Sequence, residues 1–344
     1  MKPLTFALIG CGDIAQSELD SILKIPHASV SIVMDSRLEY AKAFGQKNSL
    51  PFTDSYEEVL ASMADVVVLA VPHYLHRDLA LKAAAAGKHI VLEKPIATNH
   101  QDALDIITAS KKAGIQLSIA YVQRYNPIHQ KARELVRNGA LGSVFRIQAS
   151  DLFTKPASYW TGGYSETVST DWRANKSKSG GGVWIMNMSH TIDYLLDITG
   201  LEPVSVYAVA SNFNTPVSEV EDDASAIISF KGGSSATLSA STIAVGNPRS
   251  EELLLGTQGT LIIKGGPKLF LDRAWETYPA HEWITLDSGG KDPWQDSRDS
   301  FFSRYVDALN DRGPVPISGE EALKTLEIVL ATYESASCGR VVRL

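Results

Sequence analysis

Short apolar runs alternate with helix-like segments over roughly the first third of the chain. The runs are Leu4–Ile9, Val30–Met34, Val66–Ala70, His89–Leu92 and Gln116–Ala120. Runs made almost wholly of Val, Ile and Leu are typical of strands that are buried on both faces, and strands separated by helices form parallel sheets. The pattern therefore predicts an α/β domain with a parallel sheet over residues 1–123.

The pattern changes after Tyr125-Asn126-Pro127, where half-polar alternation replaces the continuous apolar runs. We expect helices at 128–138, 300–311 and 320–337, and strands at Val144–Ala149, Val204–Ala210, Ala224–Phe230, Ala236–Ser241, Glu251–Leu255 and Thr260–Lys264. Alternation of this kind indicates a large, mostly antiparallel open sheet with helices on one face. We therefore predict an α+β domain over residues 124–344, whose open sheet face pairs subunits into a homodimer or homotetramer.

The first apolar run leads directly into Gly10-Cys11-Gly12-Asp13-Ile14-Ala15. Glycines permit the sharp strand-to-helix turn and let backbone N–H groups approach a diphosphate, which the positive end of the following helix also favours. A glycine-rich turn without a ligand is the plainer alternative. The preceding strand, the following helix and an acid at the expected distance favour dinucleotide binding.

That acid is Asp35, which ends the second apolar run and is followed by Ser36 and Arg37. A carboxylate at this position accepts hydrogen bonds from the ribose hydroxyls of NAD and disfavours a 2′-phosphate. The guanidinium of Arg37 stacks on adenine or holds such a phosphate, so NADP remains an alternative. NAD is the predicted cofactor.

Glu93-Lys94-Pro95 follows the run His89–Leu92 at its carboxyl end, after an alanine-rich helix that ends at Gly87. Ligands of open α/β sheets bind outside the carboxyl ends of the strands. We therefore place Lys94 near the nicotinamide end of the cofactor. A solvated lysine at a strand end is the alternative.

The segment 151–180 is rich in aromatic and hydroxyl side chains, including Tyr159, Trp160, Tyr164, Asp171, Trp172 and Arg173. Long loops without regular structure tend to be functional, and aromatic rings with hydroxyl groups suit the faces and edges of a sugar. The alternative is a surface loop or an oligomer contact.

Composition excludes several classes of partner. The chain has 32 Lys and Arg against 39 Asp and Glu, a net charge of -7, so it offers no basic field to nucleic acid or to an anionic membrane. Its longest apolar run, Val66–Pro72, is far shorter than the roughly 20 residues of a membrane-spanning helix. The two cysteines, Cys11 and Cys338, make no disulfide framework, which indicates a reducing compartment, the cytoplasm.

Several short motifs occur together in a fixed order. They are Gly10 to Ala15, Ala70-Val71-Pro72 with His76, Ala86-Gly87-Lys88 before Glu93-Lys94-Pro95, Gln123 to Pro127, Leu141 to Val144, Asp171-Trp172-Arg173, Gly180 to Gly182 with His190 and Asp193, Gly256 to Leu261, and Gly339 to Leu344. In these motifs the chain resembles, from end to end, the Gfo/Idh/MocA family of glucose-fructose oxidoreductase and inositol dehydrogenase.

The resemblance implies hydride transfer between NAD or NADP and a carbinol carbon of a sugar, sugar derivative or inositol, in a cleft between the two domains. Lys94 and His190 match the family's catalytic pair, and no metal is implied. The implied cofactor contacts are Gly10, Gly12, Asp13, Ile14, Asp35, Ser36, Arg37, Val71, Pro72, His76, Glu93, Lys94, Gln123, Trp172 and Arg173. The implied substrate contacts are Lys94, Tyr121, Gln123, Tyr159, Tyr164, Asp171, Arg173, Asn187 and His190.

The chemistry of the two catalytic candidates agrees with this resemblance. Hydride loss makes the substrate hydroxyl acidic, and histidine titrates near neutral pH, so His190 suits the base unless it is a core histidine. Lys94 holds the same oxygen or relays its proton. Many relatives carry an Asp where this chain has Met186. We interpret Asn187 as a substrate-positioning residue, and Asp193 or Asp171 is the acid that would assist His190.

Two other functions fit the same motifs. One is an NAD-dependent lyase, glycosidase or epimerase that oxidises a sugar transiently, so that NADH does not accumulate. The other is a sensor that binds nucleotide and sugar without chemistry and has no need of Lys94 or His190.

Overall fold

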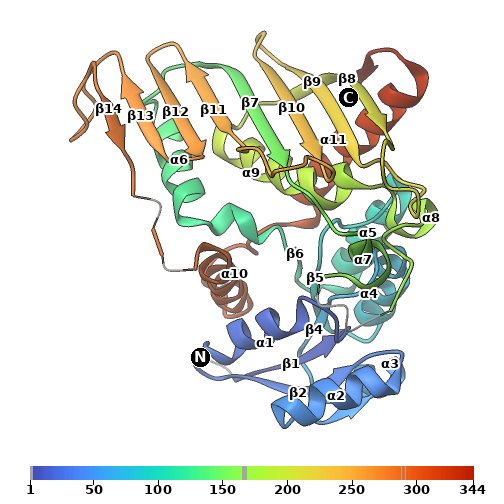
Figure 1. Ribbon diagram of the computed structural model, residues 1–344. Coiled ribbons are helices and arrows are strands. Elements are labelled where there is room, and N and C mark those ends of the chain that lie inside the picture. The colour runs from blue at the N-terminus through green and yellow to red at the C-terminus, as the bar shows by residue number, and fades with distance from the viewer. Residues whose placement is uncertain (1–2, 165–168, 288, 291) are drawn as a thin grey trace. The chain divides into compact units, whose positions relative to one another are not determined.

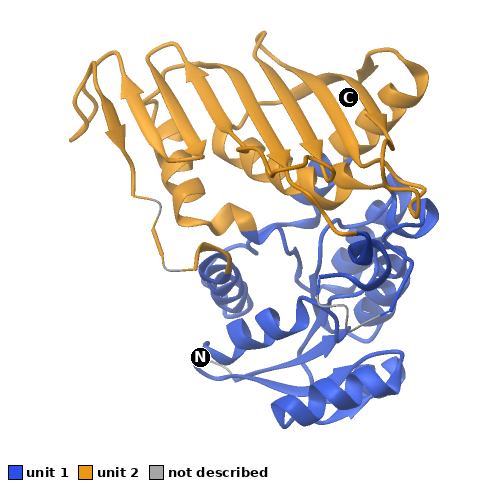
Figure 2. Ribbon diagram, viewed as in Figure 1, with its two compact units in different colours: residues 1–122, 157–180, 295–326 blue, residues 123–156, 181–294, 327–344 orange. Residues whose placement is uncertain are grey.

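The computed structural model describes residues 3–164, 169–287, 289–290 and 292–344. The chain divides into two compact units (Figure 2). Unit 1 comprises residues 1–122, 157–180 and 295–326, and unit 2 comprises 123–156, 181–294 and 327–344. We expected two continuous domains, 1–123 and 124–344. In the structure two segments of the predicted second domain, 157–180 and 295–326, belong to the first unit.

Within the described residues, unit 1 is built on a six-stranded parallel sheet of order β3-β2-β1-β4-β5-β6 (Figure 1). Its strands are β1 (Leu4–Ile9), β2 (Ala28–Met34), β3 (Phe52–Thr53), β4 (Val66–Leu69), β5 (His89–Leu92) and β6 (Leu117–Ile119). The predicted parallel sheet is confirmed, and every residue of β4 is fully buried, as its continuous apolar run indicated. The edge strand β3 was not predicted because two residues carry no periodic signal.

Helices connect these strands. They are α1 (Ala15–Leu23), α2 (Leu38–Asn48), α3 (Tyr56–Ala61), α4 (His76–Ala85) and α5 (His100–Ala113), with the short α7 (Ala157–Gly162) and α8 (Lys176–Ser179) in the segment that joins unit 1 later in the chain. Local chemistry sets their ends. The side chain of Asn99 caps α5 by accepting from the Asp102 N–H at 2.9 Å, and Gly114 ends the helix at φ +67°.

The helix α10 (Pro293–Leu309) belongs to unit 1 from Gln295 onward, and its residues there pack against the parallel sheet. Phe302 meets Phe6 edge to face at 6.5 Å between ring centroids. The Tyr305 hydroxyl lies 3.1 Å from the Ile90 carbonyl oxygen and 2.9 Å from that of Gln116, carbonyls contributed by two different segments of the unit. Such contacts between distant segments leave no periodic signal in the sequence, so the prediction of continuous domains missed them.

Unit 2 contains, in its described part, a nine-stranded sheet of order β14-β13-β12-β11-β7-β10-β9-β8-β15. Its strands are β7 (Val144–Leu152), β8 (Pro203–Ser211), β9 (Asp223–Phe230), β10 (Ser235–Ser241), β11 (Glu252–Gly256), β12 (Gly259–Lys264), β13 (Lys268–Leu271), β14 (Trp283–Thr285) and β15 (Val342–Arg343). Apart from the parallel pair β7 and β10, the printed strand pairs are antiparallel, so the predicted mostly antiparallel sheet is confirmed. The short strands β13, β14 and β15 were not predicted.

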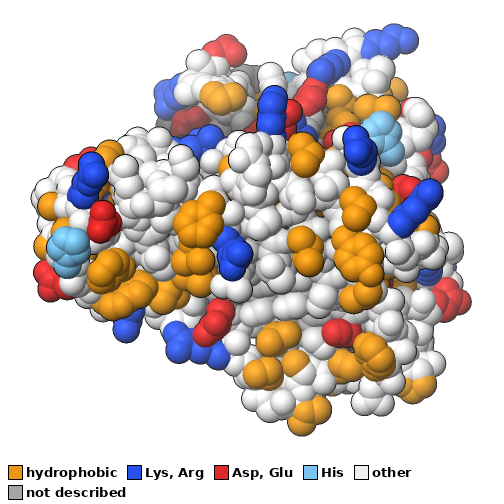
Figure 3. All heavy atoms as spheres, turned by 90° about the horizontal axis from the view of Figure 1, so that it is seen from above, with side chains coloured by type: hydrophobic (Ala, Val, Ile, Leu, Met, Phe, Trp, Pro, Cys, Tyr) orange, Lys and Arg blue, Asp and Glu red, His pale blue; other side chains and the backbone are white. Residues whose placement is uncertain are grey.

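The two faces of this sheet differ as the alternation indicated. On β9, Ala224, Ala226, Ile228 and Phe230 are buried, whereas Ile227 is 52 % exposed and stands opposite Tyr207 of β8, which is 43 % exposed. Viewed from above, hydrophobic side chains form small groups among uncharged surface and scattered charges (Figure 3). One face of the sheet is therefore open and only moderately apolar.

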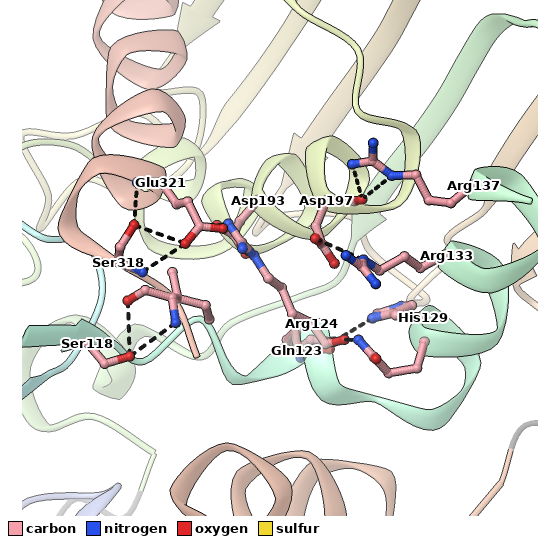
Figure 4. Close-up of polar contacts among 12 residues, drawn as sticks. Ser118, Gln123, Arg124, His129, Arg133, Arg137, Asp193, Asp197, Ser318 and Glu321 are labelled. Atoms are coloured by element: carbon pink, nitrogen blue, oxygen red, sulfur yellow. Dashed lines mark hydrogen bonds and ion pairs between the residues drawn. The ribbon is translucent and has the colours of Figure 1, made fainter. Parts of the chain in front are cut away.

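The helices α6 (Pro127–Arg137) and α9 (Ser189–Thr199) are joined by polar contacts within unit 2 (Figure 4). Arg133 Nε lies 3.1 Å from Asp197 Oδ1, and Arg137 Nη2 donates to the Asp197 carbonyl at 2.8 Å. The last long helix is α11 (Gly319–Cys338). None of the helices in the described ranges has the length and hydrophobicity to cross a membrane.

Candidate functional site

The glycine turn after β1 has the geometry of a diphosphate cradle. Gly10 adopts φ +97°, and its N–H donates to the Met34 carbonyl at 2.7 Å. A Cβ at Gly10 would overlap the Ala70 carbonyl oxygen, whereas a Cβ at Gly12 would have nothing within 4 Å. Gly10 therefore makes the turn, and Gly12 leaves open space at the start of α1 where anions are favoured.

Asp35 lies beside this turn at the end of β2. Its Oδ2 accepts the Cys11 N–H at 3.0 Å, and its Oδ1 accepts the Arg37 N–H at 3.1 Å. Each carboxylate oxygen can accept a second hydrogen bond, so the group fits the two ribose hydroxyls of NAD. The Arg37 guanidinium lies 4.1 Å over the Tyr40 ring, and its Nη1 donates to the Ser169 carbonyl at 2.7 Å. Arg37 is thus already engaged, which favours NAD over NADP.

Replacing Asp35 by alanine is expected to weaken NAD binding by roughly tenfold or more, because two charge-assisted hydrogen bonds to the ribose are lost. The affinity for NADP should fall much less, since its 2′-phosphate no longer meets a carboxylate. Titration calorimetry with both dinucleotides measures the change in preference. Asp54→Ala, which removes a different carboxylate of the same unit outside the cradle, is the control. Equal losses of affinity for both cofactors in Asp35→Ala would contradict the assignment.

The aromatic segment predicted to be functional lies against the glycine turn inside unit 1. Asp13 Oδ2 accepts the Tyr164 N–H at 2.9 Å and lies 3.4 Å from Arg173 Nη2. The Arg173 guanidinium lies 4.8 Å over the ring of Trp172 and 5.1 Å over that of Tyr159. The structure thus brings these four predicted residues together with Asp13. Residues 165–168 of the same segment lie outside the described residues.

Two histidines lie next to this group, and the sequence analysis singled out only one of them. His76 is fully buried, with Nδ1 2.9 Å from the Pro95 carbonyl oxygen and Nε2 3.1 Å from that of Val71. It therefore ties the Val71-Pro72 turn to the segment after Lys94. His73 contacts the Trp172 ring at 4.6 Å between centroids, and burial lowers its pKa. No motif distinguished His73 from a surface histidine.

Lys94 follows β5 in unit 1 and is half-buried. Its backbone N–H donates to its neighbour Glu93 at Oε2, 3.2 Å away. Burial lowers the pKa of the Lys94 ammonium to about 8, the positive charges of Arg173 and Arg298 act in the same direction, and Glu93 opposes them. Lys94 can therefore exchange a proton close to physiological pH, as a catalytic lysine must.

The second catalytic candidate belongs to a tightly built segment of unit 2. A π-helical turn at 184–188 leads straight into α9, and such turns are frequent at functional sites. Glu221 holds its start, accepting from the Gly182 N–H at 2.8 Å and from the Trp184 N–H at 3.0 Å. A Cβ at Gly182 would overlap the Glu221 carbonyl, and one at Gly181 would overlap the Tyr333 hydroxyl, so both glycines are required.

Within residues 181–195 every residue is buried except Asn187 and His190. The two predicted site residues of this segment are thus the ones left accessible. Asn187 Oδ1 accepts from Lys155 Nζ at 3.0 Å, and Lys155 is 8 % exposed. The sequence analysis missed Lys155, because a lysine after a strand carries no sign that it will be buried. His190 meets the Trp294 ring edge to face at 6.3 Å.

Both acids considered as partners of His190 have strong contacts of their own. Asp193 receives two hydrogen bonds from Arg124, at 2.6 and 2.8 Å, and both side chains are buried (Figure 4). Asp171, in unit 1, receives Lys178 Nζ at 2.7 and 2.9 Å and is 69 % exposed. Of the remaining predicted contacts, Tyr121 is buried and Gln123 is half-buried.

A buried polar cluster in unit 2 supports the Gln123 segment. His129 Nδ1 lies 2.7 Å from the Gln123 carbonyl oxygen, and its Nε2 lies 3.9 Å from Glu252 Oε2. Tyr194 stacks on the His129 ring and donates to Glu252 at 2.5 Å. Burial raises the pKa of Glu252 to about 7 and lowers that of His129 to about 4. Both groups are therefore neutral over much of the range between these values.

These two shifts make opposite contributions to stability. Between pH 4.5 and 7 the folded state keeps a proton on Glu252 that the unfolded state loses, so this contribution falls as pH rises. Between pH 4 and 6.5 the unfolded state binds a proton at His129 that the folded state lacks, so this contribution rises with pH. In the wild type the two largely cancel.

Single substitutions should separate the contributions of Glu252 and His129 to the pH dependence of the unfolding free energy. Relative to wild type, the unfolding free energy of Glu252→Gln is expected to rise with pH from about 4.5 to 7, by on the order of 3 kcal/mol. That of His129→Gln should fall over pH 4 to 6.5. Urea unfolding at several pH values measures both slopes. Two variants with the same slope as wild type would show that the groups titrate normally.

Comparison with known proteins agrees with this geometry. Residues 4–121 match the family model of the oxidoreductase family with an NAD-binding Rossmann fold, and residues 129–262 match the GFO/IDH/MocA C-terminal domain. The chain therefore belongs to the Gfo/Idh/MocA family, as an oxidoreductase with an NAD-binding domain. The sequence prediction of the family and of NAD as cofactor is confirmed.

Several relatives act on sugar derivatives. The 1,5-anhydro-D-fructose reductase of Ensifer adhaerens is 23 % identical, with 98 % of each chain covered. The 2,7-anhydro-N-acetylneuraminate hydratase of Escherichia coli strain K12 is 27 % identical over 60 % of this chain and 53 % of its own. The crystal structure of the WlbA dehydrogenase from Bordetella pertussis, in complex with NADH and UDP-GlcNAcA, has a TM-score of 0.86 at 23 % identity and covers 100 % and 98 % of the two chains. This last likeness shows the shared fold.

Proposed function

We propose that this oxidoreductase transfers a hydride between NAD and a carbinol carbon of a sugar, sugar derivative or inositol, and that Lys94 and His190 carry the proton chemistry. The observation that carries the proposal is the placement of Lys94, which is half-buried at the carboxyl end of β5, where burial lowers its pKa to about 8. A lysine without a catalytic role at the end of a strand would be solvated and charged. The full-length relative that reduces 1,5-anhydro-D-fructose supports the substrate class.

NAD, when bound, supplies the hydride acceptor for oxidation of the alcohol. In that direction His190 accepts the hydroxyl proton, and Lys94 donates a hydrogen bond to the same oxygen or relays the proton. Asn187, held by Lys155, positions a substrate hydroxyl through its amide N–H. Arg173, Trp172 and the two tyrosines of the aromatic segment contribute flat faces and hydroxyl groups for a sugar ring.

A panel of inositols, aldoses and sugar derivatives, each with NAD and with NADP, tests this function. We expect one compound to give reduced nicotinamide together with a product that has lost two hydrogens. A non-catalytic sensor would bind a compound of the panel without changing it. Binding of NAD together with complete inertness toward every sugar and polyol would contradict the proposed reaction.

The hydratase relative favours a second candidate, in which a sugar is oxidised only transiently during lyase, glycosidase or epimerase chemistry. The same panel distinguishes it when the product is identified alongside the nicotinamide absorbance. A changed sugar without net NADH indicates transient oxidation, and stoichiometric NADH indicates a dehydrogenase.

We further propose that the open face of the nine-stranded sheet joins subunits into a homodimer or homotetramer. Exposed Ile227 and Tyr207 stand opposite each other there, and Val209 of β8 is 57 % exposed. Sedimentation velocity of the purified chain measures the number of subunits.

The cytoplasm remains the proposed compartment, because Cys11 and Cys338 are free thiols rather than a disulfide.

A further inference from the structure

Three ionisable side chains from separate segments of unit 1 meet at Glu93, the residue before Lys94. Glu18 comes from α1, Glu93 follows β5, and Arg298 comes from α10. Arg298 Nη1 lies 3.3 Å from Glu93 Oε1 and 3.8 Å from Glu18 Oε1. The side chains of Glu18, Arg298 and Glu93 are 0 %, 5 % and 14 % exposed. Two acids and one base thus share a nearly dry site.

Glu18 must be neutral in this site. Neither of its carboxyl oxygens receives a hydrogen bond from an N–H or a hydroxyl group of the described residues. Its carboxyl group is 0 % exposed, and Arg298 Nη1 stands 3.8 Å away, beyond hydrogen-bonding distance. Burial, the largest cause, and repulsion from Glu93 raise the pKa of Glu18, which Arg298 only partly offsets. A buried carboxyl group without hydrogen-bond donors is most stable in its neutral form.

The charge of Glu93 couples the cluster electrostatically to the Lys94 ammonium. One oxygen of Glu93 faces Arg298, and the other accepts the Lys94 backbone N–H at 3.2 Å. Glu93, Arg173 and Arg298 act electrostatically on the Lys94 ammonium, and Lys94 in turn acts on His73. With Glu18 protonated, the negative charge of Glu93 and the positive charge of Arg298 cancel. With Glu18 ionised, a net negative charge would hold a proton on Lys94.

We propose that Glu18 and Arg298 are positioning residues for Lys94: Arg298 fixes the Glu93 carboxylate, and a neutral Glu18 keeps the cluster at zero net charge, so that Lys94 can lose and regain its proton. The catalytic role of Lys94 in this statement rests on the proposed function. The charge coupling itself involves only contacts within unit 1 and needs no bound substrate.

The test measures the titration of Lys94 in the purified chain without substrate. Trace labelling with acetic anhydride over a pH series, followed by mass spectrometry of the peptide containing Lys94, gives the pH of half-labelling. Glu18→Gln replaces a neutral acid by a neutral amide of nearly the same size, so the half-labelling pH should not move. Arg298→Met removes one positive charge, so the half-labelling pH should rise by about one unit.

Either of two results overturns the proposal. A fall of the half-labelling pH in Glu18→Gln would show that Glu18 is ionised in the wild type, and an unmoved value in Arg298→Met would show that the cluster does not act on Lys94. Asp105→Asn, which disrupts the surface pair of Asp105 with Arg77 at 2.7 Å in the same unit, is the control and should cause no shift. If Arg298→Met does not fold, Arg298→Gln removes the same charge and keeps a hydrogen-bond donor for Glu93.

Turnover provides the second readout once a substrate is known. The pH dependence of kcat/KM in Arg298→Met should move in the same direction as the labelling curve, whereas a structural defect would lower the rate at every pH. A labelling shift with turnover that is insensitive to Lys94→Ala would uphold the coupling and reject the proposed catalytic role of Lys94. The two hypotheses can therefore fail separately.

Discussion

Replacing Lys94 by alanine is expected to lower turnover by roughly 10²- to 10⁴-fold, because a group that holds or relays a proton in the transition state is lost. NAD binding should stay close to wild type, since the glycine cradle and Asp35 are untouched. Steady-state kinetics on the best substrate and calorimetry with NAD measure the two effects. Lys94→Arg should not restore the rate if a neutral amine is required, because arginine keeps its proton.

The same loss is expected for His190→Ala, since its ring is one of two accessible side chains in the otherwise buried segment 181–195. Lys82→Ala is the control for Lys94→Ala, because Lys82 is a surface lysine of unit 1 that pairs with Glu57 at 3.2 Å. If the Lys94 and His190 variants both turned over at wild-type rates, the proposed roles would be wrong. If only His190→Ala retained activity, Lys94 would be the sole proton carrier.

Replacing Gly10 by alanine is expected to destabilise unit 1 by roughly 3 kcal/mol or more, the second large effect. Two costs add: alanine at φ +97° is strained, and its Cβ would overlap the backbone carbonyl of Ala70, which cannot move without disturbing the end of β4. Denaturant unfolding measures the loss, and NAD binding should disappear with it because the turn itself is displaced.

Gly12→Ala is the matched control for this prediction. A Cβ there would have nothing within 4 Å, so the fold should keep its stability. The methyl group would nevertheless stand where the diphosphate approaches the backbone, and NAD affinity should fall by roughly tenfold or more. Equal stability of Gly10→Ala and wild type would contradict the role given to Gly10, and unchanged NAD affinity of Gly12→Ala would place the diphosphate elsewhere.

The buried cluster of His129 and Glu252 shows which features follow from the local sequence and which depend on tertiary packing. Each residue sits in a segment whose helix or strand was predicted from periodicity. Their contact at 3.9 Å joins α6 to β11, and the burial that shifts both pKa values arises only when these elements pack. Periodicity identifies a buried face but not which buried polar groups will meet on it.

The site divides in the same way. The positions of the glycine turn, Asp35 and Lys94 at the ends of strands could be predicted because each depends on a position along one strand or on its first turn. The contact of the aromatic segment with Asp13, the burial of Lys155 beside Asn187, and the pairing of Asp193 with Arg124 could not. Each of these joins side chains that are tens of residues or more apart.

The amino-acid sequence by itself determined the two kinds of sheet, the dinucleotide turn and the resemblance to the family, and it favoured NAD while leaving NADP open, because these follow from short-range hydrophobic patterns and from short motifs. Only the tertiary structure decided that residues 157–180 and 295–326 belong to unit 1, and that Arg298 lies between Glu18 and Glu93, the residue before Lys94. The physical reason is that burial and charge coupling depend on packing between distant segments. No local pattern records which segments will become neighbours.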